Sequence, residues 1–360
     1  MKPNKRKDNI KFGCYIYQDG LKYKDILNIT LVCEKLGYDS IWLKDNFTPW
    51  ISDYVSFSSN NKNNTSISGS TIGQAKLNET TMLECWTTIS SLASITTKIK
   101  IGAILVNLYR NPSIVAKMAS SLDVISNGRL EIGISAGWFE KEAYAYGFAF
   151  PTKSARVEML EESIVILRKM LRIENTDAKV SFNGKYYNIS NIECNPKPIQ
   201  KPYIPIWVGG GGKKALRVVA KYADGWNYGL CSYDEYTKTL SILKNYTNSN
   251  QLTNNNRNYN DIIKAWHGVI LLGTEEKELK NRSANIVEEK KPWKDSNLIT
   301  AGTPNTILKE INKYVDIGVT YFTIYFPDLP DTRSLRLFAE YIISHFENKS
   351  SLTESYNTSL

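Results

Sequence analysis

The sequence is poor in the residues from which metal sites and disulfide frameworks are built. It contains five cysteines, none in a Cys-x-x-Cys pair, and two histidines among 360 residues. Scattered cysteines in odd number argue against a disulfide framework and against a thiolate zinc site, and they suit a reducing cytoplasm. His267 and His345 are too few for a histidine-rich metal centre. The expectation is a cytoplasmic protein without a bound metal.

Long hydrophobic runs are absent as well. No apolar stretch approaches the roughly 18 residues that would indicate a membrane span, and no hydrophobic segment of a secretory signal follows the basic start MKPNKRKDNIK. We therefore expect no membrane partner. Of the net charge of +9, +4 lies in these first eleven residues and the rest is spread over the chain, with no basic-aromatic stripe or nucleic-acid motif. The charge fits an enzyme with an acidic small-molecule ligand, and nucleic-acid binding is not expected.

What the sequence does contain is a repeating order of amphipathic helix, glycine and short β-rich segment. Gly37, Gly128, Gly225 and Gly318 each stand between a helical pattern and a strand pattern, which is the position of a left-handed helix cap. Strands that alternate with helices predict a parallel sheet. Eight βα units in one chain predict an α/β fold, a single (β/α)8 barrel, with an open doubly wound sheet as the alternative. The eight predicted strands are Phe12–Tyr17, Ser40–Leu43, Ile99–Val106, Leu130–Ser135, Ile206–Val208, Gly225–Tyr228, Ile263–Leu272 and Tyr321–Phe326.

The predicted domain organisation is a basic disordered tail over residues 1–10, a barrel domain over 11–347 and a disordered tail over 348–360. Two inserts interrupt the barrel. Residues 52–80 are rich in Ser, Asn, Thr and Gly and predict a mobile loop, either a lid or a tolerated insertion. Residues 180–203 contain Asn-Gly between short β-rich runs, which is a hairpin signal. A helix with one buried apolar face is predicted from the spacing of Val157, Leu160, Ile164, Leu167 and Leu171.

The segment IPIWVGGGGKKALRVV places Gly209, Gly210, Gly211 and Gly212 between a predicted strand and a predicted helix. It matches neither the P-loop nor the dinucleotide-binding fingerprint. Backbone amides at a helix N-terminus nevertheless bind anions without a special side chain. One glycine would suffice for a turn, so four favour close approach of a phosphate, with a plain turn as the alternative.

Two further segments place small or polar residues after predicted strands, on the catalytic face of a barrel. Asp45 and Asn46 follow the second strand, either as catalytic residues or as caps of the next segment. Ser135, Ala136 and Gly137 follow the fourth strand, where they either let a flat ligand approach the backbone or form a tight turn.

Four other ionisable residues are interpreted mainly as structural. Arg110 either binds an anion or pairs with a neighbouring acid. Glu140 and Glu142 are expected to be solvated helix residues rather than a catalytic acid or base. His267 lies in a predicted strand and is expected to be a core or rim residue rather than a ligand contact.

Together these motifs resemble the bacterial luciferase-like superfamily, and within it the branch of oxidoreductases that depend on coenzyme F420. The resemblance covers most of the chain and is carried, in family order and spacing, by LGYDSIWLKD, by the segment from LECWTTISS to GWFEKEAYAYGF, and by PIWVGGGGKKALRVVAKYADGWN. It implies a (β/α)8 barrel of luciferase-like type with the flavin-type ring at its C-terminal mouth. It also implies hydride transfer at ring position 5.

The resemblance further implies cofactor-binding roles for individual residues. Asp45 is implied near the ring. Ile104 and Leu105 are implied behind the ring on a strand bulge, where relatives carry a non-proline cis peptide. The remaining implied contacts are Ser135, Ala136 and Gly137 beside the ring, and Gly209, Gly210, Gly211 and Gly212 at the phosphate.

Two departures from the family pattern bear on the chemistry. Many relatives carry histidine where this chain has Asn46, and some sugar-phosphate dehydrogenases carry glutamate where it has Trp138. A neutral amide and an indole cannot replace an acid-base pair. Oxidation of an alcohol, as in those sugar-phosphate dehydrogenases, is therefore not expected. An apolar substrate fits better, with Trp50, Trp138 and Phe139 as candidates for the substrate pocket.

The sequence thus predicts an oxidoreductase that transfers hydride between coenzyme F420 and a small, apolar organic substrate. One alternative is a monooxygenase that uses reduced FMN and oxygen, because FMN also carries a phosphate. The basic charge favours coenzyme F420, whose tail is polyanionic. A second alternative is a cofactor-binding protein without turnover. Relatives are often dimers, so the resemblance also implies a homodimer.

Overall fold

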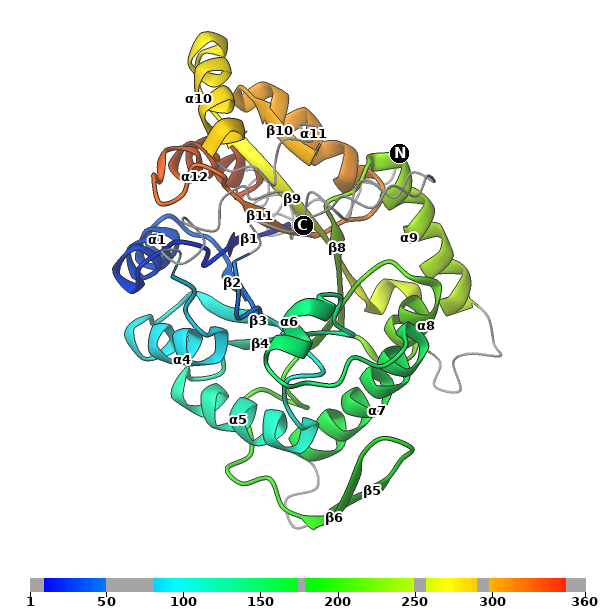
Figure 1. Ribbon diagram of the computed structural model, residues 1–360. Coiled ribbons are helices and arrows are strands. Elements are labelled where there is room, and N and C mark those ends of the chain that lie inside the picture. The colour runs from blue at the N-terminus through cyan, green and yellow to red at the C-terminus, as the bar shows by residue number, and fades with distance from the viewer. Residues whose placement is uncertain (1–9, 50–80, 174–178, 249–256, 290–297, 348–360) are drawn as a thin grey trace, which may run out of the picture.

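A computed structural model describes residues 10–49, 81–173, 179–248, 257–289 and 298–347. Within these ranges, eight parallel strands form a closed ring with helices around it (Figure 1). The predicted (β/α)8 barrel is confirmed. The insert predicted over 52–80 and almost all of both predicted tails lie outside the described residues.

The ring runs in the order β1, β2, β3, β4, β7, β8, β9 and β11, and β11 pairs with β1 to close it. All eight strands that the sequence predicts are present, and their ends agree to within one residue. The bounds are β1 (Lys11–Ile16), β2 (Ser40–Lys44), β3 (Lys100–Val106), β4 (Leu130–Ser135), β7 (Ile206–Gly209), β8 (Gly225–Gly229), β9 (Ile263–Leu272) and β11 (Tyr321–Tyr325).

Three short strands stand outside the ring. β10 (Ile299–Gly302), which the sequence did not predict, pairs with the last residues of β9. β5 (Val180–Asn183) and β6 (Asn188–Ile192) form an antiparallel pair within the predicted insert 180–203. Figure 1 shows this hairpin projecting away from the barrel below α5 and α7.

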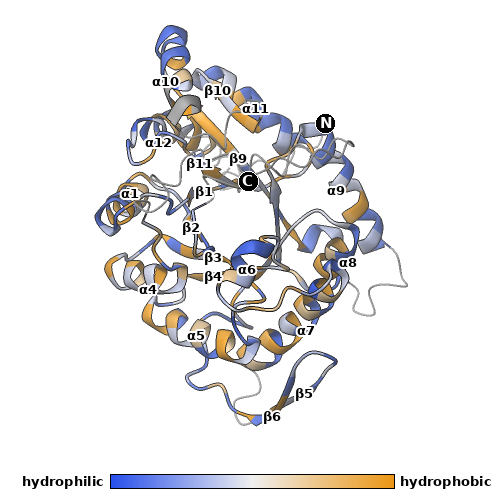
Figure 2. Cartoon of the chain, viewed as in Figure 1, coloured by the Kyte–Doolittle hydropathy of each residue, from blue (hydrophilic) through white to orange (hydrophobic). Residues whose placement is uncertain are grey.

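The helices surround the ring, and their apolar faces supply the outer core. Every residue of the predicted apolar face of α7 is buried. In Figure 2, the last residues of β9 are hydrophobic, whereas α6 and α10 are largely hydrophilic. The helix bounds are α1 (Tyr23–Lys35), α4 (Cys85–Ile95), α5 (Pro112–Ile125), α6 (Glu140–Ala145), α7 (Lys153–Leu171), α8 (Lys213–Tyr222), α9 (Tyr233–Asn248), α10 (Glu276–Glu289), α11 (Pro304–Asp316) and α12 (Arg333–Phe338), with a 3₁₀ turn at Tyr259–Asp261 and a π turn at Ala339–Ile343.

Three of the four predicted glycine caps have the backbone conformation that such a cap requires. Gly37, Gly128 and Gly318 have φ values of 80°, 77° and 99°, which glycine adopts without strain. The prediction for Gly225 is wrong, because this residue opens β8. A Cβ atom there would lie 2.1 Å from the ring of Trp207, so close packing, and not capping, requires glycine.

Aromatic side chains fill the barrel below its carboxyl end. The ring centroids of Trp42 and Trp207 are 5.5 Å apart, and Trp207 lies 4.8 Å from Tyr321. Gly102 makes room for them, since a Cβ atom there would lie 2.4 Å from the Trp42 ring. The barrel is therefore a packed core at this level, and a ligand can enter only above it.

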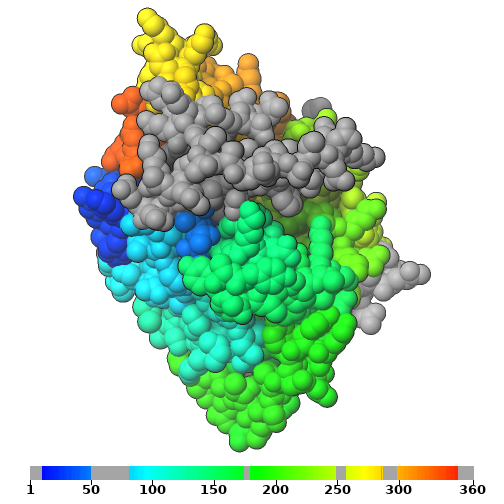
Figure 3. Space-filling view, viewed as in Figure 1, coloured from blue at the N-terminus to red at the C-terminus, as the bar shows by residue number. Residues whose placement is uncertain are grey.

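The opposite end of the barrel carries the loops that follow the strands. In Figure 1, α6 lies over one side of the ring, next to β3 and β4. The space-filling view shows the segment around α6 in the middle of this face (Figure 3). Among the described residues, no helix combines the length and the apolar character needed to cross a bilayer.

Candidate active site at the carboxyl end of the barrel

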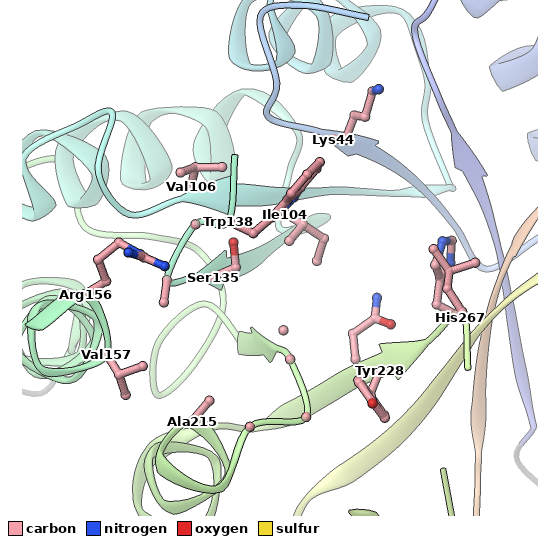
Figure 4. Close-up of a pocket in the computed structure, with 18 of the residues that line it drawn as sticks. Lys44, Ile104, Val106, Ser135, Trp138, Arg156, Val157, Ala215, Tyr228 and His267 are labelled. Atoms are coloured by element: carbon pink, nitrogen blue, oxygen red, sulfur yellow. The ribbon is translucent and has the colours of Figure 1, made fainter. Parts of the chain in front are cut away.

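A cavity of about 750 Å³ opens at the carboxyl ends of the barrel strands. This volume is within the range of small-molecule and cofactor sites. Figure 4 shows Ile104, Ser135 and Trp138 on one side of it and His267 opposite. Most residues predicted for the site line this cavity, and they are Asp45, Asn46, Ile104, Ser135, Ala136, Gly137, Trp138, Gly209, Gly210, Gly211 and Gly212.

Three predicted site residues do not join this wall. Leu105 is buried away from the cavity, because successive side chains of a strand point to opposite faces and Ile104 takes the inward position. Phe139 does not line the cavity and instead stacks on Trp138 with ring centroids 5.0 Å apart. Trp50 lies outside the described residues.

The expected strand bulge and non-proline cis peptide at Ile104–Leu105 are also wrong for this chain. β3 pairs with β4 residue by residue from Ile101 to Val106, without a shift of register. The cis peptide bonds of the described residues all precede proline, and this one is not among them.

The glycine segment forms a cradle of backbone amides where β7 passes into α8. Gly210 has a φ of 116°, and its carbonyl oxygen accepts a hydrogen bond of 2.9 Å from Trp226 Nε1. Because N–H and C=O point in opposite directions across a trans peptide, this bond turns the Gly211 amide away from Trp226. Gly212 is the N-cap of α8 and has no side chain to cap the first turn.

The cradle is also open at two of its glycines, Gly210 and Gly212. A Cβ atom at Gly210 would meet nothing within 4 Å, and one at Gly212 would meet only Lys153 Cε at 4.0 Å. The amides of Gly211, Gly212 and Lys213 have no acceptor among the described residues. Unpaired amides at the positive end of a helix dipole are donors of the kind that bind anions in proteins.

Asp45 is the buried acid of the cavity. Its Oδ2 accepts hydrogen bonds from the Val106 amide at 2.9 Å and from Arg110 Nη1 at 2.6 Å. Its Oδ1 is buried and has no partner among the described residues. Burial raises the pKa of Asp45 to about 6, although Arg110 opposes that shift. Arg110 also binds Glu84 Oε1 at 2.5 Å. Of the two alternatives that the sequence left open for this arginine, pairing with a neighbouring acid is the one that the structure shows.

Glu142 corrects one sequence-based expectation. It is buried and not solvated. Its carboxylate accepts hydrogen bonds from Asn46 Nδ2 at 3.0 Å and from the Tyr109 hydroxyl at 2.6 Å. It also accepts, each at 2.8 Å, from the Phe47 amide and from the amide and hydroxyl of Thr48. Five donors on one carboxylate tie α6 to the loop that follows β2. The contacts also orient Asn46, because a carboxylate accepts only and therefore selects the amide nitrogen.

His267 is a hydrogen-bonded strand residue, as expected, but it also lines the cavity. Its Nδ1 lies 2.8 Å from the Thr323 carbonyl oxygen. A carbonyl only accepts, so Nδ1 carries the proton and Nε2 accepts from the Tyr17 hydroxyl at 2.9 Å. Burial lowers the pKa of His267 to about 4, which keeps the imidazole neutral at physiological pH.

Several lining residues were missed by the sequence reasoning. Four stand at strand ends, and that position alone would have identified them; two others belong to the first turn of α7 and carry no local signal. These six of the missed residues are Tyr15, Tyr17, Asn227, Tyr228, Lys153 and Arg156. Among the described residues, no group of His, Cys, Asp or Glu side chains could hold a metal ion.

A model of the luciferase-like monooxygenase family matches residues 9–245. The chain belongs to this family. Its membership confirms the predicted class, an oxidoreductase of luciferase-like fold.

The relatives of this luciferase-like protein include both F420-dependent enzymes and monooxygenases. An F420-dependent glucose-6-phosphate dehydrogenase of Amycolatopsis mediterranei (strain U-32) is 23% identical over 347 residues, covering 89% of this chain and 93% of the relative. A pyrimidine monooxygenase of Acinetobacter baylyi (strain ATCC 33305 / BD413 / ADP1) is 32% identical over 172 residues, covering 46% of this chain and 44% of the relative. The solved structure of an F420-dependent secondary alcohol dehydrogenase with an F420-acetone adduct has a TM-score of 0.74 at 17% identity, covering 93% of this chain and 99% of that one.

Proposed function

We propose that this luciferase-like protein binds coenzyme F420 and uses it for hydride transfer with a small organic substrate. The observation that carries the proposal is the cavity, in which the glycine cradle and an apolar wall of Ile104, Val106 and Ala136 belong to one space. A phosphorylated ligand with a flat ring system uses both features. The F420-dependent dehydrogenase that aligns over 93% of its own length supports the choice of cofactor.

The residues present fit such a cofactor. The amides of Gly211, Gly212 and Lys213 would hold its phosphate, and the apolar wall would hold its ring. Asp45 Oδ1, buried without a partner among the described residues, would accept a hydrogen bond from a hydroxyl or ring N–H of the ligand. When bound, the deazaflavin supplies the ring carbon that gives or takes the hydride.

Proton transfer then falls to side chains of the cavity wall. Asn46 is an amide and cannot exchange a proton, and its nitrogen is held by Glu142. His267 is a weak base because its pKa is about 4. Asp45, with a pKa of about 6, is mainly ionised near neutral pH and still basic enough to accept a proton. We assign it the role of holding or accepting the substrate proton.

The second candidate is a monooxygenase that uses reduced FMN and oxygen. The pyrimidine monooxygenase of Acinetobacter baylyi, at 32% identity over its aligned part, favours it. FMN would use the same cradle and the same apolar wall. A cofactor-binding protein without turnover is the remaining alternative, and an apolar substrate stays a prediction.

Separate titrations with the two cofactors test the proposal. Oxidised coenzyme F420 and oxidised FMN are each added to the protein, and ligand fluorescence is followed with a fixed concentration of salt. We expect saturable binding of coenzyme F420, with FMN at least about tenfold weaker, which corresponds to about 1.4 kcal/mol. Tight binding of FMN without binding of coenzyme F420 would overturn the leading assignment and select the monooxygenase.

Two coarser properties complete the proposal. All five cysteines are free, and four of them are buried, which supports a reducing compartment such as the cytoplasm. A homodimer follows from the resemblance alone. Light scattering on the purified protein would give the mass of the assembly, and a monomer at micromolar concentration would contradict the dimer.

A further inference from the structure

The first turn of a second helix stands beside the glycine cradle. α7 begins at Lys153 and α8 at Lys213, and Lys214 Nζ donates to Ser154 Oγ at 2.5 Å. Lys153 Cε is the nearest atom to the position that a Cβ of Gly212 would take. Two helix N-termini therefore converge at one end of the cavity, and both contribute positive dipole ends there.

Arg156 stands in this first turn of α7 and lines the cavity. The residue is 9% exposed, and Figure 4 shows its side chain extending from α7 in the direction of Ser135. Its guanidinium lies 3.8 Å from the centroid of the Phe150 ring, and Nη1 donates to the Pro151 carbonyl oxygen at 2.5 Å. Ring and carbonyl fix the orientation of the guanidinium before any ligand arrives.

The remaining edge of this guanidinium is unused. Nε is buried without a hydrogen-bond partner, and Nη2 has none either, among the described residues. No carboxylate of the described residues forms an ion pair with it. Burial lowers the pKa of Arg156, and the exposed Glu140 only partly opposes that shift. A buried guanidinium without a counter-ion is unfavourable unless an anion completes it.

We propose that Arg156 is an anion-binding residue, which together with the amides of Gly211–Lys213 recognises a phosphoryl group in the cavity. The Nε and Nη2 edge is the planar fork that binds two oxygens of one phosphate. The inference rests on the proposed function for the identity of the main ligand. The phosphoryl group belongs either to the cofactor or to a phosphorylated substrate, and the chemistry of recognition is the same.

Binding measurements on charge variants test the role of Arg156. Arg156→Gln removes the charge, Arg156→Lys keeps it without the fork, and Arg217→Gln, on the exposed side of α8, is the matched control. Affinities are measured for coenzyme F420 and FMN and for their phosphate-free counterparts, the deazariboflavin core and riboflavin. We expect Arg156→Gln to weaken the phosphorylated ligand that the wild type binds by about tenfold to a hundredfold, with Arg156→Lys in between and the phosphate-free ligands unchanged.

Inorganic phosphate is the second probe, and it separates the two sources. Thermal unfolding of the cofactor-free protein is compared in phosphate and in chloride at equal ionic strength. We expect phosphate to stabilise the wild type and Arg217→Gln, but not Arg156→Gln. If this Arg156-dependent stabilisation persists with saturating cofactor, while cofactor affinity is indifferent to Arg156, the phosphoryl group belongs to the substrate.

The outcomes distinguish this inference from the proposed function. Unchanged affinities together with unchanged stabilisation by phosphate in folded Arg156→Gln, or in Arg156→Lys if the glutamine variant does not fold, would overturn the inference. If the wild type binds neither cofactor but shows Arg156-dependent stabilisation by phosphate, the proposed function fails and the anion site stands.

Discussion

Replacing Asp45 with asparagine should change how the stability of the protein depends on pH. Burial raises the pKa of Asp45 from 3.8 to about 6 in the folded chain. The folded state therefore binds this proton more tightly than the unfolded state. The free energy of unfolding then falls as the pH rises from about 4 to above 6, and a difference of about two pKa units corresponds to about 3 kcal/mol.

Asparagine is neutral throughout this range, so the variant lacks this loss. At pH 8 the free energy of unfolding of the variant should therefore exceed that of the wild type by up to about 3 kcal/mol. An amide N–H₂ that takes the place of the unpartnered Oδ1 reduces this gain by about 1–3 kcal/mol. Arg110 keeps its ion pair with Glu84, so the variant should fold. Cofactor binding or turnover should weaken, because the buried acceptor of the cavity is lost.

The assay is urea unfolding of wild type and Asp45→Asn at intervals between pH 4.5 and pH 8, followed by tryptophan fluorescence. The informative quantity is the difference between the two proteins, because it removes His267, which titrates in the same window with the opposite effect on stability. Glu140→Gln, which replaces an exposed acid, is the control, and its stability should depend on pH as that of the wild type does. Parallel pH profiles for wild type and Asp45→Asn would refute the reasoning.

Three further substitutions or titrations follow from the same cavity. Glu142→Gln should lower the free energy of unfolding by about 2–4 kcal/mol, because an amide nitrogen would face donors whose hydrogen bonds the carboxylate now accepts. Glu140→Gln should change it by less than about 0.5 kcal/mol in the same urea experiment, and equal effects of the two substitutions would contradict the structural role of Glu142. Gly212→Asp should leave the free energy of unfolding unchanged or slightly higher, because aspartate is a good N-cap for α8. It should nevertheless weaken cofactor binding at least about tenfold by repelling the phosphate, whereas Gly212→Ala should bind the cofactor nearly as the wild type does. Normal cofactor affinity of the aspartate variant would contradict phosphate binding at the cradle. His267 should give an NMR titration with a pKa of about 4, so lowering the pH from 6.5 to 4 destabilises the fold through this group. The only other histidine, His345, provides the comparison signal. A titration midpoint of His267 near pH 6.5 would contradict the neutral imidazole.

Much of the barrel follows from the sequence because the signals for its elements are local. The alternation of strand and helix patterns placed all eight ring strands to within one residue, and three of the four glycine caps have the predicted conformation. The prediction of a cap at Gly225 was wrong because a glycine can be required for close packing as well as for capping. That distinction depends on Trp207, which belongs to another strand.

Local patterns predicted the candidate site where its residues stand at or just after strand ends, whereas Ile104 was implied by the family resemblance. Asp45, the segment 135–137 and the four glycines were found in this way, since the carboxyl ends of barrel strands meet at one face. Leu105 was misplaced because only one of two successive strand residues can face the cavity, and Ile104 takes that position. Phe139 was misplaced because the direction of a side chain in a loop is decided by its packing neighbours. Short-range patterns do not contain that information.

The pairings that give the cavity its chemistry were decided by tertiary structure alone. Glu142 reaches Asn46 across 96 positions of sequence, and His267 reaches Tyr17 across 250. Arg156 sits in an ordinary helical pattern, and only the packing of α7 beside α8 brings it to the glycine cradle. The residues by themselves determined the barrel and its glycine-rich turn, because helix, strand and turn propensities act over a few residues. Charge state and side-chain orientation depend on burial and on distant partners, and these exist only once the ring has closed.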